Sequence, residues 1–136
     1  MRALIVLLII AAGSGLPAAA AAPEPFASPT LVIVEMHDFR FRPSVIRIPP
    51  GRPVILRLIN RGQLAHQMQS RAFLETPVTI VSGGSYVEAP GLEIFRLQPG
   101  AQGDLRFTPR ARGRVRFTCT IEGHAEAGMI GTFDLR

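Results

Sequence analysis

Residues 117–131 read Phe-Thr-Cys-Thr-Ile-Glu-Gly-His-Ala-Glu-Ala-Gly-Met-Ile-Gly, and this stretch says most about the fold. It contains a thiol, an imidazole and a thioether in the order Cys119-x4-His124-x4-Met129. A glycine stands directly before the histidine and before the methionine, where it permits a tight turn. If one strand ends before the cysteine and the next begins at the methionine, the loop can present three soft or borderline donors to one point. The stretch therefore predicts a metal-binding loop between two β-strands.

A copper site that accepts both oxidation states needs imidazoles beside its sulfur donors, so a further histidine is expected. The chain has two others, His37 and His66. His66 follows the apolar segment 53–60 through the turn-like sequence Asn-Arg-Gly, which places it at the end of a strand. A position at the same pole of the fold as the Cys119 loop would complete the site, and His37 is the competing candidate.

The rest of the chain reads as short β-strands. Runs rich in Val, Ile, Leu, Phe and Thr alternate with Pro and Gly, and no long helical period is present. This spacing predicts an all-β sandwich, with a short helix at 71–76 that Pro77 ends and a loop at 82–85. The candidate strands are residues 30–36, 44–48, 53–60, 92–97, 104–108, 113–119 and 129–135.

The N-terminal 22 residues have the pattern of an export signal. The basic Arg2 precedes an apolar run, a Gly-Ser-Gly-Leu-Pro break and a series of alanines. We expect residues 1–22 to be a signal peptide and residues 23–136 to be one domain that is periplasmic or otherwise exported. An uncleaved membrane anchor is the alternative, because the uncharged segment could just span a bilayer. Both interpretations place the domain outside the cytoplasm.

Cys119 is the only cysteine, so the chain has no internal disulfide. A free thiol in an exported protein calls for an explanation, and metal binding and burial as a small apolar side chain are the two alternatives. The neighbouring histidine and methionine favour metal binding.

The chain is basic, with 15 arginines, no lysine and 10 acidic residues, for a formal net charge of +5. One tyrosine, no tryptophan and no nucleic-acid motif argue against nucleic-acid binding. Arginines alternate at positions 110, 112, 114 and 116 and so share one face of an extended strand. That face is either a docking stripe for a redox partner or an ordinary solvated surface.

Together these features resemble the cupredoxins, the blue (type 1) copper proteins that include rusticyanin, plastocyanin and azurin. The resemblance is closest to members whose ligand loop also runs Cys-x4-His-x4-Met. It implies a cupredoxin-like Greek-key β-sandwich of about seven to eight strands. The segments that carry it are 39–43 leading to 45–48, the Pro50-Gly51 turn, 58–60 before His66, 107–109 and the loop 119–131.

The resemblance implies one copper ion in a type 1 site. His66, Cys119 and His124 would form its trigonal ligand set, and Met129 would be the weak axial ligand. The implied function is one-electron transfer with copper cycling between Cu(I) and Cu(II). Periplasmic copper storage or delivery by the same site is the alternative. We do not expect an enzyme, because the chain lacks the His-x-His pairs or second domain of multicopper oxidases and nitrite reductases.

The family also suggests how partners would meet the site. His124 is typically the exposed ligand, so redox partner proteins are expected to dock transiently near it, on a monomer without stable membrane insertion. Gln67 stands where several blue-copper proteins place Asn or Ser to tie the ligand loops together. Met36, His37 and Met68 form either a second, copper(I)-accepting site or a partly exposed histidine with two packing methionines.

Overall fold

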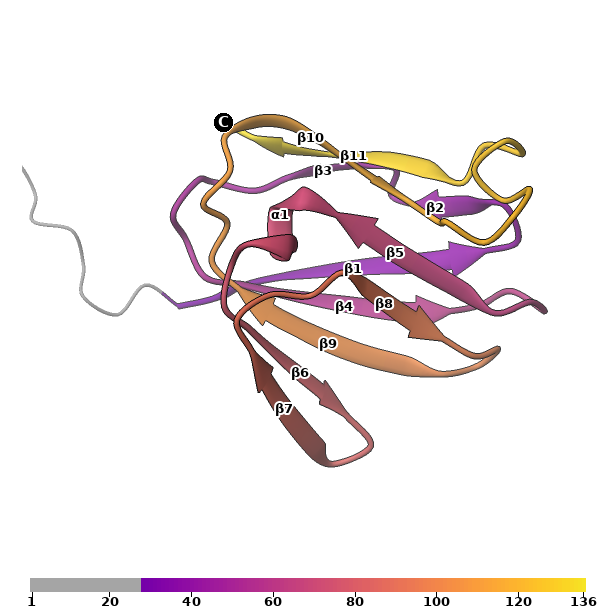
Figure 1. The fold of residues 1–136 in the computed structure, drawn as a ribbon, viewed down its shortest axis with the longest axis horizontal. Coiled ribbons are helices and arrows are strands. Elements are labelled where there is room, and N and C mark those ends of the chain that lie inside the picture. The colour runs from indigo at the N-terminus through magenta and orange to yellow at the C-terminus, as the bar shows by residue number, and fades with distance from the viewer. Residues whose placement is uncertain (1–27) are drawn as a thin grey trace, which may run out of the picture.

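The computed structural model describes residues 28–136 as two β-sheets packed face to face (Figure 1). The larger sheet has the strand order β2-β1-β4-β9-β6-β7, and the smaller has the order β3-β11-β10-β5-β8. The strands are β1 (Thr30–His37), β2 (Arg40–Arg42), β3 (Val45–Arg47), β4 (Val54–Asn60), β5 (His66–Ser70), β6 (Val78–Ser82), β7 (Ser85–Ala89), β8 (Ile94–Leu97), β9 (Gln102–Phe107), β10 (Gly113–Thr118) and β11 (Ile130–Leu135).

The predicted β-sandwich is confirmed, with eleven strands rather than seven to eight. All seven candidate strands are present, with ends that differ by up to two residues. The four strands that the sequence did not predict are β2, β5, β6 and β7. The predicted signal peptide at residues 1–22 lies outside the described residues. Within residues 28–136 no helix is long and apolar enough to cross a membrane.

Two segments differ from their predicted form. The helix α1 covers Arg71–Leu74 rather than 71–76, and the Ser70 hydroxyl caps its start by accepting from the Ala72 N–H at 3.2 Å. The loop predicted at 82–85 is the tight turn of the β6–β7 hairpin. Gly83 and Gly84 adopt φ values of 56° and 82° there, a conformation that glycine adopts without steric cost.

The core lies between the two sheets and follows the alternation of side chains along each strand. In β4, Val54, Leu56 and Leu58 face inward and are buried, whereas Arg57 faces outward. Arg57 is accommodated on this central strand because its guanidinium pairs with Asp104 of β9 at 2.8 and 2.9 Å. Residues of the smaller sheet complete the core: Ile46, Met68, Phe95, Leu97, Phe117, Phe133 and Leu135.

The alternating arginines lie on the solvent side of strand β10 of the smaller sheet and in the segment of chain that precedes this strand. Arg114 and Arg116 are exposed on β10, and Arg110 and Arg112 are exposed in the segment that leads into it. The predicted solvent-facing stripe is therefore present. Its role in docking stays a prediction.

Three connections meet at one end of the sandwich, on the right in Figure 1. They are the β1–β2 turn, the β4–β5 connection and the β10–β11 loop. The register brings them together: β1 runs parallel to β4 with Met36 opposite Asn60, and β10 pairs with both β11 and β5. The segments around the predicted metal ligands therefore converge, although they lie far apart in the sequence.

Candidate metal centre

Three of the four predicted ligands form a compact buried cluster. One donor atom each from His66, Cys119 and His124 lies within 4.8 Å of the others. His66 Nδ1 is 3.3 Å from His124 Nδ1, and Cys119 Sγ is 3.4 Å from the same nitrogen. His66 and Cys119 are 0 % exposed and His124 is 6 % exposed. In residues 28–136 this is the one group of three or more His, Cys or acidic side chains with such spacing.

The loop that carries Cys119, His124 and Met129 is held by its own backbone. The Cys119 N–H donates to the Met129 carbonyl at 3.1 Å, and the Met129 N–H donates to the His124 carbonyl at 2.9 Å. Gly123 and Gly128 have φ values of 79° and 107°, so both adopt the left-handed conformation that their positions suggested. The Met129 side chain is fully buried. The fourth predicted ligand is thus hydrogen-bonded through its backbone to two of the other three, Cys119 and His124.

The connection that leads to His66 is held by the side chain of Asn60, at the end of β4. Its amide N–H groups donate to the carbonyls of Leu64 at 2.8 Å and Leu97 at 3.1 Å, and its amide oxygen accepts from the Gly62 N–H at 2.9 Å. Asn60 is 1 % exposed, so these bonds satisfy the polar atoms of its amide that water cannot reach. His66 then opens β5 with its ring directed at the cluster.

Asp38, in the β1–β2 turn, fixes the other side of the His66 ring. Its Oδ1 accepts from His66 Nε2 at 3.0 Å, and from the backbone N–H groups of Gln63 at 3.1 Å and Leu64 at 3.3 Å. A carboxylate only accepts, so Nε2 carries the proton and Nδ1 keeps a free lone pair toward Cys119 and His124. Asp38 was not predicted as part of the site, because 28 residues separate it from His66 in the sequence.

The electrostatics of this pair agree with its geometry. The N–H of Gln63 is the main cause that lowers the pKa of Asp38 below its usual value, and His66 adds to the effect. Burial lowers the pKa of His66, with Asp38 opposing the shift. The neutral imidazole that a metal ligand requires is therefore favoured at His66.

Phe39 contacts the second imidazole from the same turn. Its ring centroid lies 5.3 Å from that of His124 in an edge-to-face arrangement, with an angle of 83° between the planes. Phe39 has a φ of 65°, the one non-glycine residue of the described chain in this region. Its side chain is 42 % exposed. Two adjacent residues of one turn therefore contact both imidazoles.

Gln67 supplies the tie between ligand loops that shorter residues make in several blue-copper proteins. Its side-chain amide N–H donates to the Thr120 hydroxyl, directly after Cys119. Because Gln67 follows His66 on β5 and Thr120 follows Cys119, this bond connects the segment that carries His66 to the loop that carries Cys119. Gln67 has a longer side chain than the Asn or Ser of several blue-copper proteins, and it still makes the hydrogen bond between the ligand loops.

His37, the competing candidate, lies outside the cluster. Its Nε2 is 3.1 Å from the Glu35 carboxylate, and its side chain is 27 % exposed. Met36 and Met68 are both 0 % exposed in the core. The structure therefore favours the interpretation of a partly exposed histidine with two packing methionines.

The donor set fits copper. A thiolate and two imidazoles with a neighbouring thioether suit an ion that alternates between a softer reduced state and a harder oxidised one. A structural zinc site usually has four strong ligands, whereas a thioether is a weak one.

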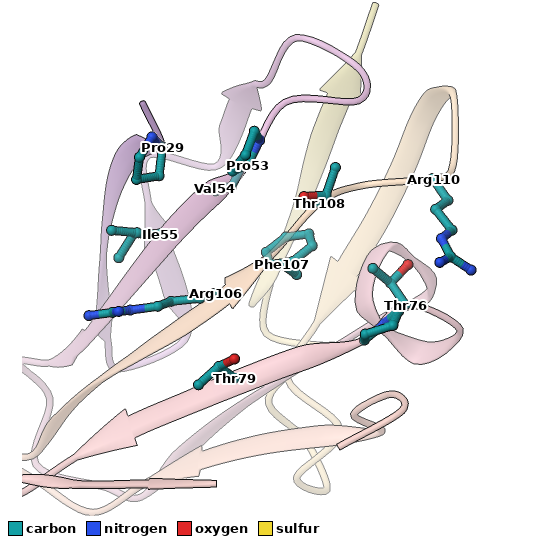
Figure 2. Close-up of a pocket in the computed structure, with 11 residues that line it drawn as sticks. Pro29, Pro53, Val54, Ile55, Thr76, Thr79, Arg106, Phe107, Thr108 and Arg110 are labelled. Carbon is teal, nitrogen blue, oxygen red and sulfur yellow. The ribbon is translucent and has the colours of Figure 1, made fainter. Parts of the chain in front are cut away.

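A separate hollow lies at the opposite end of the sandwich, where β1 and β4 begin and β9 ends (Figure 2). Proline, threonine, arginine and apolar side chains line it, and none of the predicted metal ligands does. The lining residues include Pro29, Pro53, Thr76, Phe107 and Arg110.

Solved structures of copper proteins share this fold, whereas no protein-family model and no curated protein matches the chain. Auracyanin B is 21 % identical over 81 % of this chain and 91 % of its own, with a TM-score of 0.58. Auracyanin A, described as a "blue" copper protein from the green thermophilic photosynthetic bacterium Chloroflexus aurantiacus, is 15 % identical over 80 % of this chain and 100 % of its own, with a TM-score of 0.55.

Larger copper enzymes contain the same architecture as one part of their chains. A multicopper oxidase from Campylobacter jejuni is 14 % identical over 84 % of this chain but only 31 % of its own, with a TM-score of 0.61. With the auracyanins, this likeness confirms that the protein has the cupredoxin fold that its sequence predicted. The auracyanins match it over nearly their full length, unlike the oxidase.

Proposed function

We propose that this protein holds one copper ion and carries single electrons. His66, Cys119 and His124 would hold the ion, with the Met129 thioether as a weaker donor. The observation that supports this most strongly is the convergence of the three donor atoms within 4.8 Å in a buried cluster. When bound, copper supplies the chemistry by alternating between Cu(I) and Cu(II).

The protein contributes a frame that keeps the ligands in place while the charge changes. The Cys119–Met129 loop is held by backbone hydrogen bonds, and His66 is held by Asp38 and the Asn60-capped turn. Side chains that cannot move far limit the reorganisation that accompanies electron transfer. A rigid site of this kind suits a carrier.

Partner proteins would dock over His124, the more exposed of the two imidazoles. Phe39 and Leu64 are 42 % and 45 % exposed in the two connections beside it, and Ala127 is exposed in the ligand loop. A small apolar surface of this type suits transient electron-transfer encounters. We further propose that the protein works outside the cytoplasm as a monomer and is not an enzyme.

Copper storage or delivery is the second candidate, and the environment of the methionines weighs against it. Copper handed from one protein to another as Cu(I) needs accessible soft donors. Met36 and Met68 are fully buried in the core and so present no such donor at the surface.

Electrochemistry of the copper-loaded protein distinguishes the two. We expect one copper ion per chain, a reversible one-electron wave, and electron exchange that is much faster than loss of Cu(I) to a competing chelator. An irreversible wave, with copper leaving on reduction, would favour delivery over electron transfer.

A further inference from the structure

Asp38 is the one acidic side chain of the described residues that is hydrogen-bonded to a proposed copper ligand. Glu122 and Glu126 lie closer in sequence to His124, but both are exposed, and neither has a hydrogen bond to the site. We propose that Asp38 is a positioning residue that holds His66 with Nδ1 toward the copper and lowers the reduction potential of the centre. This inference rests on the proposed function.

The positioning part follows from the three hydrogen bonds at Oδ1. One comes from the His66 ring and two come from the backbone of residues 63 and 64, three and two positions before that histidine. The carboxylate therefore positions both the ring and the chain that carries it, mainly through Oδ1, with Oδ2 also accepting from the Gln63 N–H at 3.2 Å. Partners that orient a ligating histidine in this way commonly affect metal affinity by about 10- to 100-fold.

Gly62 shows how closely the site is built around this contact. A Cβ at position 62 would lie 2.3 Å from Asp38 Oδ1 and 2.7 Å from His66 Nε2. Any larger residue would separate the carboxylate from the imidazole or displace the ring. The pair thus requires a glycine in the turn.

The effect on the reduction potential follows from charge. The oxidised centre carries one more positive charge than the reduced centre, and an adjacent carboxylate stabilises the more positive state. Its hydrogen bond also makes the His66 imidazole a stronger donor, which favours Cu(II) further. Uptake of one electron from a partner is therefore less favourable with Asp38 than without its charge, and the step transfers no proton.

The competing interpretation is that Asp38 only caps the turn at Gln63 and Leu64. Asp38→Asn separates the two, because the amide oxygen can take the place of Oδ1 and keep the three hydrogen bonds made there, whereas the further contact of the Gln63 N–H with Oδ2 at 3.2 Å is lost. The variant removes the charge and leaves the acceptor. Glu126→Gln is the matched control, since it removes the same charge from the ligand loop at a side chain without such a bond.

The test compares the midpoint potentials of the copper-loaded wild-type protein, Asp38→Asn and Glu126→Gln by voltammetry, with the visible spectra recorded in parallel. We expect Asp38→Asn to keep its thiolate band and to shift the equilibrium about tenfold toward the reduced form, which is about 59 mV for one electron. Glu126→Gln should shift it much less. Equal potentials in all three proteins would overturn the inference, whereas a wild-type protein without a thiolate band would instead refute the proposed function.

A second measurement needs no variant and no copper. Nitrogen-15 NMR of the metal-free wild-type protein should show His66 protonated at Nε2 with a slowly exchanging proton, because that nitrogen donates to Asp38. A proton on Nδ1 would contradict the positioning role even if Asp38→Asn failed to fold.

Discussion

The two halves of the site are the loop from Cys119 to Met129 and the segment that carries His66, and hydrogen bonds from different groups hold them. Cys119, His124 and Met129 lie within eleven residues and are fixed by hydrogen bonds between backbone groups of their own loop. His66 is fixed by side chains from elsewhere, with Asn60 shaping the turn and Asp38 holding the ring. A side-chain substitution can therefore loosen the His66 half while the Cys119 half stays intact.

The largest effect is expected from Asn60→Ala. It removes three hydrogen bonds at a side chain that is 1 % exposed, among them the bonds that Asn60 donates to the Leu64 and Leu97 carbonyls. We expect the free energy of unfolding of the metal-free protein to fall by about 2 to 4 kcal/mol. Urea titration measures it, and Ser82→Ala, which removes one exposed hydrogen bond, is the control. Equal losses in the two variants would show that Asn60 does not hold the His66 half.

Gly62→Ala tests the His66 half by steric crowding, and removes no hydrogen-bonding group. The added methyl group must push the Asp38 carboxylate away from His66, with an expected loss of about 1 to 2 kcal/mol as their hydrogen bonds weaken. Thermal unfolding of the metal-free protein gives the stability, and NMR reports the His66 Nε2 proton. Gln63→Ala should change neither, because residue 63 contributes its backbone to the contact. An unchanged Nε2 signal in Gly62→Ala would mean that the turn adjusts without separating the pair.

The bond between Gln67 and Thr120 joins the two halves, so its removal shows how strongly they are coupled. Gln67→Ala and Thr120→Val should each cost about 1 kcal/mol. The double variant should cost less than the sum, because either change alone breaks the bond. Chemical denaturation of the four proteins in this cycle measures the coupling. Strict additivity would indicate that the halves are held independently.

The smallest effect concerns Arg57 and Asp104, which join β4 to β9 away from the site. The hydrogen bond from Arg57 is the main cause that lowers the pKa of Asp104. Its stabilisation is thus complete above the usual Asp pKa of about 3.9 and is lost as the pH falls through the lower folded value. Arg57→Gln should be less stable than wild type at pH 7, and the difference should narrow below about pH 4. If the difference in stability between Arg57→Gln and wild type persisted in acid, it would come from packing of the Arg57 side chain and not from the ion pair. The copper spectrum at pH 7 should not change.

The same contrast explains which parts of the site were predictable. Cys119, His124 and Met129 show their relation in a local spacing, and glycines mark the turns between them. Asp38 contacts His66, 28 positions later in the chain, and Thr120 contacts Gln67, 53 positions earlier. Only the register of the sheets reveals those contacts. Such pairs leave no periodic signal in a single sequence.

Strand β5 was missed for a related reason. Its sequence, His-Gln-Met-Gln-Ser, reads as polar, yet four of its five residues are buried. The polar groups of His66, Gln67 and Ser70 are satisfied by Asp38, Thr120 and the Arg116 carbonyl. Hydrophobic alternation cannot identify a strand whose burial depends on polar partners supplied by the fold.

The most direct test of the central claim is the visible spectrum of the copper(II)-loaded protein and of three variants. We predict a strong thiolate-to-copper band that Cys119→Ser abolishes, that His66→Ala removes or strongly alters, and that His37→Ala leaves unchanged. A colourless wild-type complex, or a band that disappears with His37→Ala and survives His66→Ala, would contradict the proposed site.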